Sequence, residues 1–355
     1  MKHETLKSLA ASGSSAIGRR RVLKVGAGLG AVLGLPVAFS QAEAKAPVVR
    51  LGVATIPKIW ALGRYDGTYD NELGVPTKWL SYDSGAVLLP MFAAGEVDLA
   101  ILGSPPIVAS IARKLPIKVL GAPEIINTSE RLIGRDNIKT MKDLEGKRVA
   151  FPGASTLHYA LEMAMRTHGV DGSKVRRLTL AQPEIVAAWK RGDIDAAYIA
   201  GPFWSELLAS GGHQVIASGE LQPATYVWNG VIVRNEFAAK YPATVARCLQ
   251  TMQSMYNRYK ADPSAVSEQL AKAYGANAEA TKLSLAGLAY PTFEEQLTGK
   301  YFGSGPDTPT APLVKSMDDQ GKFLADLGEL SRNSVPPSYA PYVDVALMRR
   351  AFPGK

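Results

Sequence analysis

The sequence predicts an α/β protein built from two similar lobes, and two observations lead to this fold class. First, residues 92–105 and 189–202 repeat one pattern at an offset of 97 positions: a helix that ends at Gly, an acidic residue, an apolar residue, Asp, and a short apolar strand that runs to Pro. Second, the strands in both copies are unbroken apolar runs, which are typical of parallel sheets covered on both faces. We therefore expect two α/β units of similar build.

The first 44 residues predict an export signal and not a part of the fold. Three arginines at 19–21 precede the uncharged run 25–39, whose 15 residues are too few to span a bilayer as a stable anchor. The small-x-small triplet at 42–44 is typical of a signal-peptidase site, so we expect cleavage after about Ala44. The arginine pair followed by Val-Leu-Lys also resembles a twin-arginine signal, so the general and the twin-arginine export routes both stay open.

Each lobe is expected to open in the same way. Apolar strands at 49–54 and 148–151 each lead into a loop and then into a helix with apolar periodicity. On this pattern the first lobe covers 46–133 and the second lobe covers 139–226.

The C-terminal part of the chain, 231–355, is predicted to be largely helical and to pack back on lobe one. The chain would then cross between the lobes twice, near 134–137 and near 228–231. Proline-containing joints separate the predicted helices from one another. The predicted helices are 237–260, 264–274, 278–288 and 311–330.

Charge and cysteine content argue against several classes of protein. Residues 1–44 carry six Lys or Arg and two Asp or Glu, so removing them lowers the net charge from +8 to +4. No run of Lys or Arg with interleaved aromatic residues occurs, so we expect no nucleic-acid partner. Cys248 is the only cysteine, so no disulfide can form within one chain, and its apolar surroundings predict a core position.

The sequence carries no signature of a metal site, a nucleotide site or a catalytic nucleophile. His158, His168 and His213 lack the spacing of a zinc site. The chain also has no Gly-x-Ser-x-Gly elbow and no Gly-x-x-x-x-Gly-Lys loop. We therefore expect no cofactor, and a binding protein in preference to an enzyme.

Three loops at the expected carboxyl ends of strands carry a hydroxyl group in front of a helix, at Ser84, Ser104 and Ser155. Ser104 and Ser155 are predicted N-caps, and Pro105 is then the first helical residue after Ser104. Ligands of open α/β sheets bind at these strand ends, where the free backbone N–H groups of helix N-termini attract an anion. The alternative is that all three serines are ordinary helix caps.

One histidine and three tryptophans are further candidates for the site. His158 is the third residue of the helix that follows Ser155, where its ring contacts either the ligand or solvent. Trp60, Trp204 and Trp228 fall in or beside strand-end loops, which makes them candidate pocket walls. Plain packing is the alternative for each of these rings.

Six segments together give the chain a family resemblance, and the two most specific are 155–159, with the sequence Ser-Thr-Leu-His-Tyr, and 187–195. The other four segments are 83–86, 95–98, 102–104 and 127–130. With these segments the chain resembles the taurine-binding proteins of bacterial ABC importers, within the nitrate/sulfonate/taurine-binding family. The resemblance covers about 49 to 237 and continues more weakly through the C-terminal helices.

The resemblance implies a two-lobed periplasmic-binding-protein fold of the class II type, with the ligand in a cleft between the lobes. It also implies a monomer in the periplasm that delivers a small organic sulfonate, taurine or a related alkanesulfonate, to an ABC permease in the inner membrane. On the family pattern the sulfonate lies among Ser104, Ser155, Thr156 and His158, and Glu130 lies near the opposite end of the ligand.

Two positions depart from the family pattern. Asn229 stands where the family carries an Asp, and an Asn side chain cannot neutralise an ammonium group. Ala200 stands where the family has a Trp, which should enlarge that part of the pocket. Both departures favour an alternative ligand, which is a bulkier sulfonate, one without an amine, or another organic anion. A further alternative is an enzyme on the same fold, of the sulfinate desulfinase or thiamine-pyrimidine synthase type.

Overall fold

The structure is a computed structural model that describes residues 45–354, which belong to one compact unit. The expected export signal, at 1–44, lies outside the described residues. Between residues 45 and 354 no helix is both long enough and apolar enough to cross a membrane.

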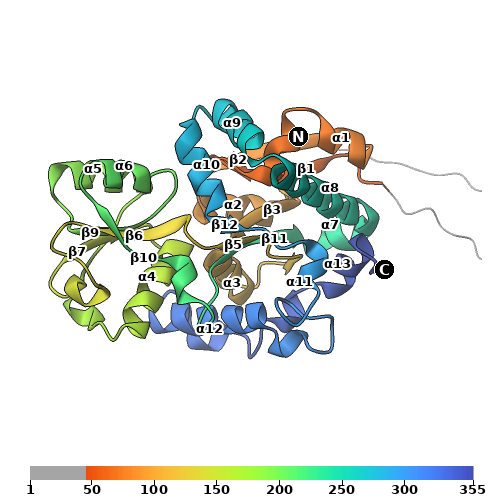
Figure 1. Cartoon of the computed structure of the whole chain (residues 1–355). Coiled ribbons are helices and arrows are strands. Elements are labelled where there is room, and N and C mark those ends of the chain that lie inside the picture. Colours follow the sequence, from red (N-terminus) through yellow and green to blue (C-terminus); the bar gives the residue numbers. More distant parts are fainter. Residues whose placement is uncertain (1–44, 355) are drawn as a thin grey trace, which may run out of the picture. The chain divides into compact units, whose positions relative to one another are not determined.

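The larger of two sheets combines strands from the early and the late parts of the chain (Figure 1). Its strands are β1 (Val49–Ala54), β2 (Thr77–Tyr82), β3 (Leu99–Gly103), β4 (Ile117–Val119), β5 (Glu124–Ile126), β11 (Trp228–Arg234) and β12 (Leu288–Ala289). They lie in the order β12-β5-β11-β3-β1-β2, and β4 also pairs with β11. Strand β1 is parallel to β2 and β3, whereas β11 is antiparallel to β3, β4 and β5.

The smaller sheet is the sheet of the second lobe. Its strands are β6 (Glu130–Gly134), β7 (Arg148–Phe151), β8 (Arg176–Thr179), β9 (Ala196–Ala200) and β10 (His213–Ala217), in the order β10-β6-β9-β7-β8. Strand β7 is parallel to β8 and β9, and β6 is antiparallel to β9 and β10. The expected mixture of helices and two sheets in a two-lobed α/β fold is therefore confirmed.

The chain crosses between the two sheets a few residues earlier than predicted. Strand β6 was expected in lobe one, with the crossing near 134–137, but it pairs with β9 in the smaller sheet, so the first crossing precedes Glu130. Strand β11 already lies in the larger sheet at Trp228, so the second crossing precedes the expected 228–231. The apolar pattern of β6 is the same in either sheet, and only its pairing partner decides its lobe.

The internal repeat corresponds to two equivalent ion pairs. In the larger sheet Asp98 accepts hydrogen bonds from the backbone N of Arg50 at 3.0 Å and from its guanidinium at 2.8 Å and 2.9 Å. In the smaller sheet Asp195 accepts the same set from Arg148, at 2.8 Å, 3.1 Å and 2.9 Å. The repeated Asp thus fixes the start of the parallel strand next to its own in each lobe, and Asp98 also pairs with Arg234 at 2.8 Å.

Helices cover both sheets and continue after β11. The six helices that follow strands of the two lobes are α1 (Thr68–Leu73), α2 (Gly85–Ala93), α3 (Ser104–Ala112), α4 (Thr156–Thr167), α5 (Gln182–Arg191) and α6 (Trp204–Ala209). The C-terminal helices are α7 (Asn235–Lys240), α8 (Pro242–Ala261), α9 (Pro263–Tyr274), α10 (Ala278–Ala286), α11 (Phe293–Gln296), α12 (Pro312–Asp326) and α13 (Val345–Ala351). Short 3₁₀ turns lie at 59–64, 141–144, 172–174, 218–221, 308–310, 332–334 and 340–342.

The helix predicted over 237–260 is divided in the structure. Helix α7 ends at Lys240, and Tyr241 has a non-helical backbone with φ −132° and ψ 52° before α8 begins at Pro242. The proline ring disfavours a helical conformation in the residue before it, and proline itself fits the first position of a new helix. The other three predicted helices correspond to α9, α10 and α12.

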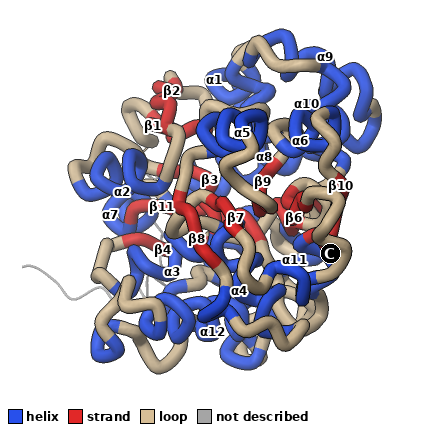
Figure 2. The backbone as a smooth tube through the Cα atoms, turned by 90° about the vertical axis from the view of Figure 1, so that its left-hand side faces the viewer, coloured by secondary structure: helices blue, strands red, loops and turns tan. Residues whose placement is uncertain are grey.

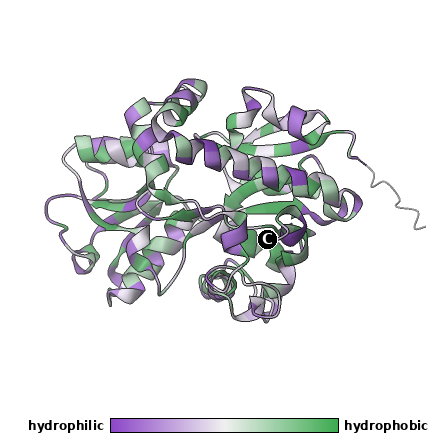
Figure 3. Ribbon diagram, turned by 45° about the vertical axis from the view of Figure 1, so that its right-hand side comes forward, coloured by the Kyte–Doolittle hydropathy of each residue, from purple (hydrophilic) through white to green (hydrophobic). Residues whose placement is uncertain are grey.

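Helices lie on both faces of the smaller sheet, as its apolar strands predicted. Figure 2 shows α5 and α6 on one side of its strands and α4 on the other. Along β7, Val149 and Phe151 belong to the core on the α4 side, whereas Ala150 belongs to the core on the α5 side. The inner strands of both sheets are mostly apolar along their length (Figure 3), whereas the edge strands β2 and β8 carry polar residues.

The C-terminal segment packs on lobe one, but one of its helices also reaches lobe two. Cys248 on α8 is fully buried in the core of lobe one, as predicted. Helix α12 packs along α3, and its Phe323 ring lies 5.8 Å from the ring of His158 and 5.2 Å from the ring of Tyr159, both on α4. The C-terminal segment therefore contacts both lobes.

Candidate ligand-binding site

A cavity of about 430 Å³ is lined by residues of both lobes. Lobe one contributes residues that follow β1, β2 and β3, and lobe two contributes residues around the ends of β7 and β9. These are the carboxyl ends of parallel strands, where the α/β fold places its ligands.

Four helices begin at this cavity, and α5 contributes only its first residue, Gln182. Gly85 and Ala86 of α2, Pro105 of α3, and Thr156 and Leu157 of α4 all line it. The N–H groups in the first turn of a helix have no partner within the helix, and the helix dipole places partial positive charge there. The loops predicted to meet at one site do meet, and their helix ends can bind an anion.

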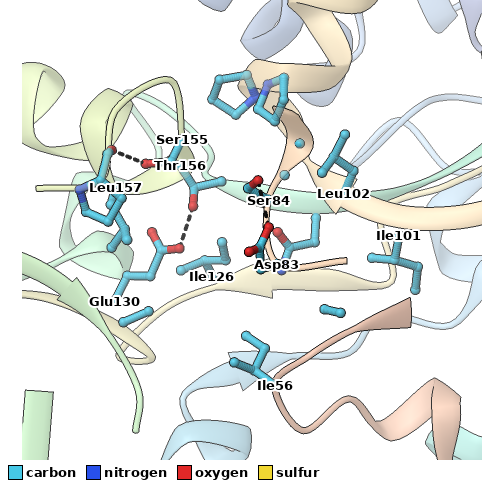
Figure 4. Close-up of a pocket in the computed structure, with 18 of the residues that line it drawn as sticks. Ile56, Asp83, Ser84, Ile101, Leu102, Ile126, Glu130, Ser155, Thr156 and Leu157 are labelled. Carbon is cyan, nitrogen blue, oxygen red and sulfur yellow. Dashed lines mark hydrogen bonds between the residues drawn. The ribbon is translucent and has the colours of Figure 1, made fainter. Parts of the chain in front are cut away.

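Ser84 and Ser155 line the cavity, but their hydroxyl groups already have partners (Figure 4). The Ser155 hydroxyl donates to the carbonyl of Pro152 at 2.6 Å and accepts from the backbone N of His158 at 3.2 Å, so its predicted N-cap role is confirmed. The exposed Ser84 hydroxyl donates to Asp83 at 2.9 Å. Each hydroxyl keeps an oxygen lone pair, and neither keeps a free proton for a ligand.

Ser104 is not the N-cap that the sequence predicted. Gly103 takes that position, and Ser104 is the first residue of α3. Ser104 is fully buried, its neighbours Gly103 and Pro105 line the cavity, and its hydroxyl has no hydrogen-bond partner among the described residues. The Ser-Pro-Pro sequence predicted that the helix begins at Pro105, and in the structure it begins one residue earlier, at Ser104.

Glu130 and Thr156 form the most buried polar pair of the cavity. The Thr156 hydroxyl donates to Oε1 of Glu130 at 2.5 Å, and the two side chains point toward each other in Figure 4. Oε2 of Glu130 has no partner within residues 45–354. Burial raises the pKa of Glu130 from 4.5 to about 7, against the opposing effects of the Thr156 hydrogen bond and the charge of Lys58. The carboxyl is therefore partly protonated at neutral pH.

A second polar cluster lies on the lobe-one side of the cavity. Asn229 and Lys58 line the cavity, and both donate to the same oxygen of Glu124, each at 2.8 Å. Glu124 is 1% exposed, and its other oxygen accepts a long hydrogen bond of 3.4 Å from Tyr256. The Asn229 side chain is thus held by a carboxylate of the protein.

His158 does not line the cavity. Its ring stacks on Phe151 with a centroid distance of 4.6 Å and meets the edge of Phe323. Burial lowers the pKa of His158, so the ring is neutral at physiological pH. The first turn of α4 presents Thr156 and Leu157 to the cavity, whereas the ring of His158 is turned toward Phe151 and Phe323.

None of the three candidate tryptophans lines the cavity. Trp60 is fully buried, with its ring 5.3 Å from that of Trp79, and Trp228 is fully buried, with its ring 5.7 Å from that of Phe302. Trp204 is 3% exposed and donates its indole N–H to the carbonyl of Ser129. Their apolar rings pack in the cores of the two lobes.

Several further polar residues at or beside the cavity were not predicted from the sequence. Lys58 stands in the loop after β1, so the same strand-end rule that selected Ser84 could have found it. Glu124 is the one acid in the apolar run 117–126, a pattern that indicates a buried, paired charge. Thr281 and Ser284 of α10 also line the cavity, and no local signal marks them, because packing across the fold brings them there.

The remaining wall of the cavity is largely apolar. Ala200 lines it, and Gly201 lies against Ser284 from the facing lobe. The aliphatic lining residues are Ile56, Leu89, Ile101, Leu102, Ile126, Leu157, Leu285, Leu288 and Leu324. Nowhere in the described chain do three or more His, Cys, Asp or Glu side chains gather as metal ligands could. The cavity therefore combines a polar region around Glu130, Thr156 and Lys58 with apolar walls that suit a hydrocarbon group.

Comparison with known proteins gives a consistent set of relatives. Residues 71–266 match the NMT1/THI5-like family. The taurine-binding periplasmic protein of Escherichia coli K12 is 30% identical over 318 residues, which cover 86% of this chain and 94% of that protein.

Solved structures show the same fold at lower identity. The alkanesulfonate-binding protein of Xanthomonas axonopodis pv. citri, solved bound to MOPS, superposes with a TM-score of 0.69 at 18% identity and covers 84% of this chain and 99% of its own. A desulfurization enzyme, DSZB, superposes with a TM-score of 0.63 at 15% identity and covers 87% of this chain and 99% of its own. The fold alone is thus shared by binding proteins and an enzyme.

Proposed function

Because this chain belongs to the NMT1/THI5-like family, we propose that it is the solute-binding protein of an ABC importer and that it captures a small organic sulfonate between its lobes. One observation carries the proposal: the N-termini of α2, α3 and α4, which come from both lobes, meet at one cavity. An anion there would contact both lobes at once, so its binding favours the closed state.

The proposed mechanism needs no chemical step. Each helix end contributes about 0.3–1 kcal/mol to holding an anion, and more where it is partly buried. The aliphatic walls contribute about 25 cal/mol for each Å² of ligand surface that they remove from water. A micromolar ligand requires about 8 kcal/mol in all, which several such contacts supply.

The enzyme alternatives have less support. A sulfinate desulfinase needs a reactive cysteine in the cleft, and Cys248 is fully buried on α8, outside the cavity lining. Burial also raises the pKa of the Cys248 thiol, which keeps it protonated and unreactive. The thiamine-pyrimidine synthase alternative conflicts with the export signal expected at 1–44.

The proposed setting follows from the same family membership. The chain would act in the periplasm as a monomer, after cleavage near Ala44, and would present its ligand to a permease in the inner membrane. The expected signal at 1–44 and the periplasmic relative support this setting.

A bulkier or amine-free sulfonate is the second candidate ligand. Ala200 leaves room that a larger side chain would fill, and Asn229 offers a neutral amide where an ammonium-binding site would place a carboxylate. If each of the three oxygens of a sulfonate binds a different helix N-terminus, a carboxylate ligand should bind more weakly, because it has only two oxygens.

A thermal-shift screen of the purified protein tests the proposal. The ligands are taurine, alkane- and arylsulfonates, sulfate, nitrate and matched carboxylates. A ligand at one hundred times its Kd adds about 2.7 kcal/mol of stability. We expect a shift with at least one sulfonate and a smaller one with its carboxylate counterpart. The assignment would be overturned if cations stabilise the protein or if none of the sulfonates does.

A further inference from the structure

We propose that Lys58 is the cation that binds the anionic head group of the ligand and that Glu124 is its positioning residue. The inference rests on the proposed function, because it assumes an anionic ligand in the cavity. It adds a residue in the loop after β1, where the family resemblance pointed to the serines and His158 instead.

Two cations are among the residues that line the cavity in the described chain, Lys58 and Arg113. Arg113 is exposed and donates to the backbone carbonyl of Glu329 at 3.0 Å. The side chain of Lys58 is 12% exposed. A charge that is largely removed from water interacts more strongly with a ligand anion than an exposed one does. Lys58 is therefore the cation best placed to bind the head group.

The hydrogen bonds of Lys58 leave capacity for a ligand. An ammonium group has three N–H donors, and Glu124 takes one of them, at 2.8 Å. Glu124 itself does not line the cavity, so it cannot bind the ligand directly. Since Asn229 donates to the same oxygen of Glu124, the carboxylate is fixed from two sides and holds the ammonium at the cavity wall.

If the ion pair of Lys58 and Glu124 served stability alone, it would not need to lie at the cavity. Burying two charges costs several kcal/mol per ion, and apolar residues of similar volume often replace such a pair without loss of stability. The site lies next to aliphatic residues that could fill the space, such as Ile56 and Ile101. A paired lysine at a ligand cavity is explained better by an anion that binds its remaining donors.

The opposite wall of the cavity is compatible with an anion near Lys58. A Cβ atom on Gly103 would lie 3.0 Å from Thr156 of lobe two and 3.7 Å from Asn229 of lobe one, so the two lobes approach closely at this point. The raised pKa of Glu130 limits its negative charge at neutral pH, which reduces repulsion of the head group. The anion can therefore bridge Lys58 and the N-terminus of α4.

The test compares a charged ligand with an uncharged one of nearly the same shape. Binding of ethanesulfonate and of ethyl methyl sulfone is measured by calorimetry for the wild type, Lys58→Met, Lys58→Arg and Lys78→Met. Lys78 on β2 is exposed and does not line the cavity, so its variant is the matched control. We expect Lys58→Met to weaken ethanesulfonate by about tenfold or more, as charge-assisted bonds require, and the sulfone by much less. Lys58→Arg should retain most of the affinity.

Two outcomes separate this inference from the proposed function. If the wild type binds sulfonates and Lys58→Met binds them as well as Lys78→Met does, the role of Lys58 is wrong and the function stands. If the wild type binds no sulfonate, the proposed function fails first. Lys58→Met leaves Glu124 without its cation, so Lys58→Met combined with Glu124→Gln is measured in parallel. An equal loss of ethanesulfonate affinity in a fully folded double variant supports the inference, and an unchanged affinity overturns it.

Discussion

The hydroxyl of Thr156 lies 2.5 Å from Oε1 of Glu130, and this bond joins the first residue of α4 to the first residue of β6 inside the cavity. It leaves the second carboxyl oxygen of Glu130 without a partner among the residues that the structure describes. A ligand, a proton or a donor from the facing lobe can each use that oxygen, and Glu130 is a group of the site whose raised pKa lies near neutral pH.

The first prediction concerns the pH dependence of stability. Burial raises the pKa of Glu130 from 4.5 to about 7, so the folded chain binds a proton more readily than the unfolded chain. The contribution of Glu130 to stability is therefore fully present below about pH 4.5 and is lost as the pH rises to about 7. At about 1.4 kcal/mol per pKa unit, the free energy of unfolding falls by roughly 3 kcal/mol over this range. Urea unfolding at pH 5 and pH 7.5 should show this fall in the wild type and a smaller one in Glu130→Gln. Equal falls would contradict the prediction.

The second prediction concerns protons taken up when the ligand binds. An anion placed near Glu130 raises the pKa of Glu130 further, because a like charge disfavours the carboxylate. Calorimetry with a sulfonate at pH 7, in two buffers of different ionisation enthalpy, should therefore show net proton uptake. The uptake should disappear in Glu130→Gln. Proton release would mean that the ligand places a cationic group beside Glu130.

The third prediction concerns the choice between ligands with and without an amine. Asn229 donates to Glu124 at 2.8 Å, so Asn229→Asp replaces this bond by two carboxylates that share Lys58. The added negative charge should raise the affinity for taurine relative to ethanesulfonate by about tenfold, which is about 1.4 kcal/mol. Asn333→Asp adds the same charge at an exposed position and is the control. A ratio that stays the same would show that position 229 does not distinguish an amine.

The fourth prediction compares the two repeated ion pairs. Asp98 is fully buried and holds two arginines, whereas the side chain of Asp195 is 22% exposed and holds one. Asp98→Asn should therefore cost about 3 kcal/mol, as removal of one partner from a buried pair does, and Asp195→Asn nearer 1 kcal/mol. Urea unfolding monitored by circular dichroism measures both. A larger loss for Asp195→Asn would contradict the ranking.

The sequence allowed prediction of the features that depend on local pattern. The repeat around Asp98 and Asp195 predicted two lobes of similar build, and the hydroxyl-bearing loops were expected at one site because parallel strands end at the same edge. The N-cap role of Ser155 was also predictable, because the cap acts on a backbone N–H only three residues away.

Other features depend on contacts between distant parts of the chain. His158 is covered by Phe323, and Trp228 packs on Phe302, and both partners follow in sequence by more than seventy positions. Nothing near His158 or Trp228 reveals these partners, so their burial could not be predicted. The crossing before β6 was misplaced for the same reason, since only its pairing with β9 assigns it to a lobe.

The contact of Phe323 with α4 has a consequence for how the two lobes separate. Because α12 is fixed along α3, any opening of the cleft must move the rings of His158 and Tyr159 across the Phe323 side chain or break those contacts. The lobes then separate by a shear motion in which α4 slides past Phe323, and the extent of this motion is limited. It is not an unrestricted hinge rotation about the two segments that connect the lobes. Trimming Phe323 to alanine should make the empty molecule wider on average in small-angle scattering while leaving both cores folded.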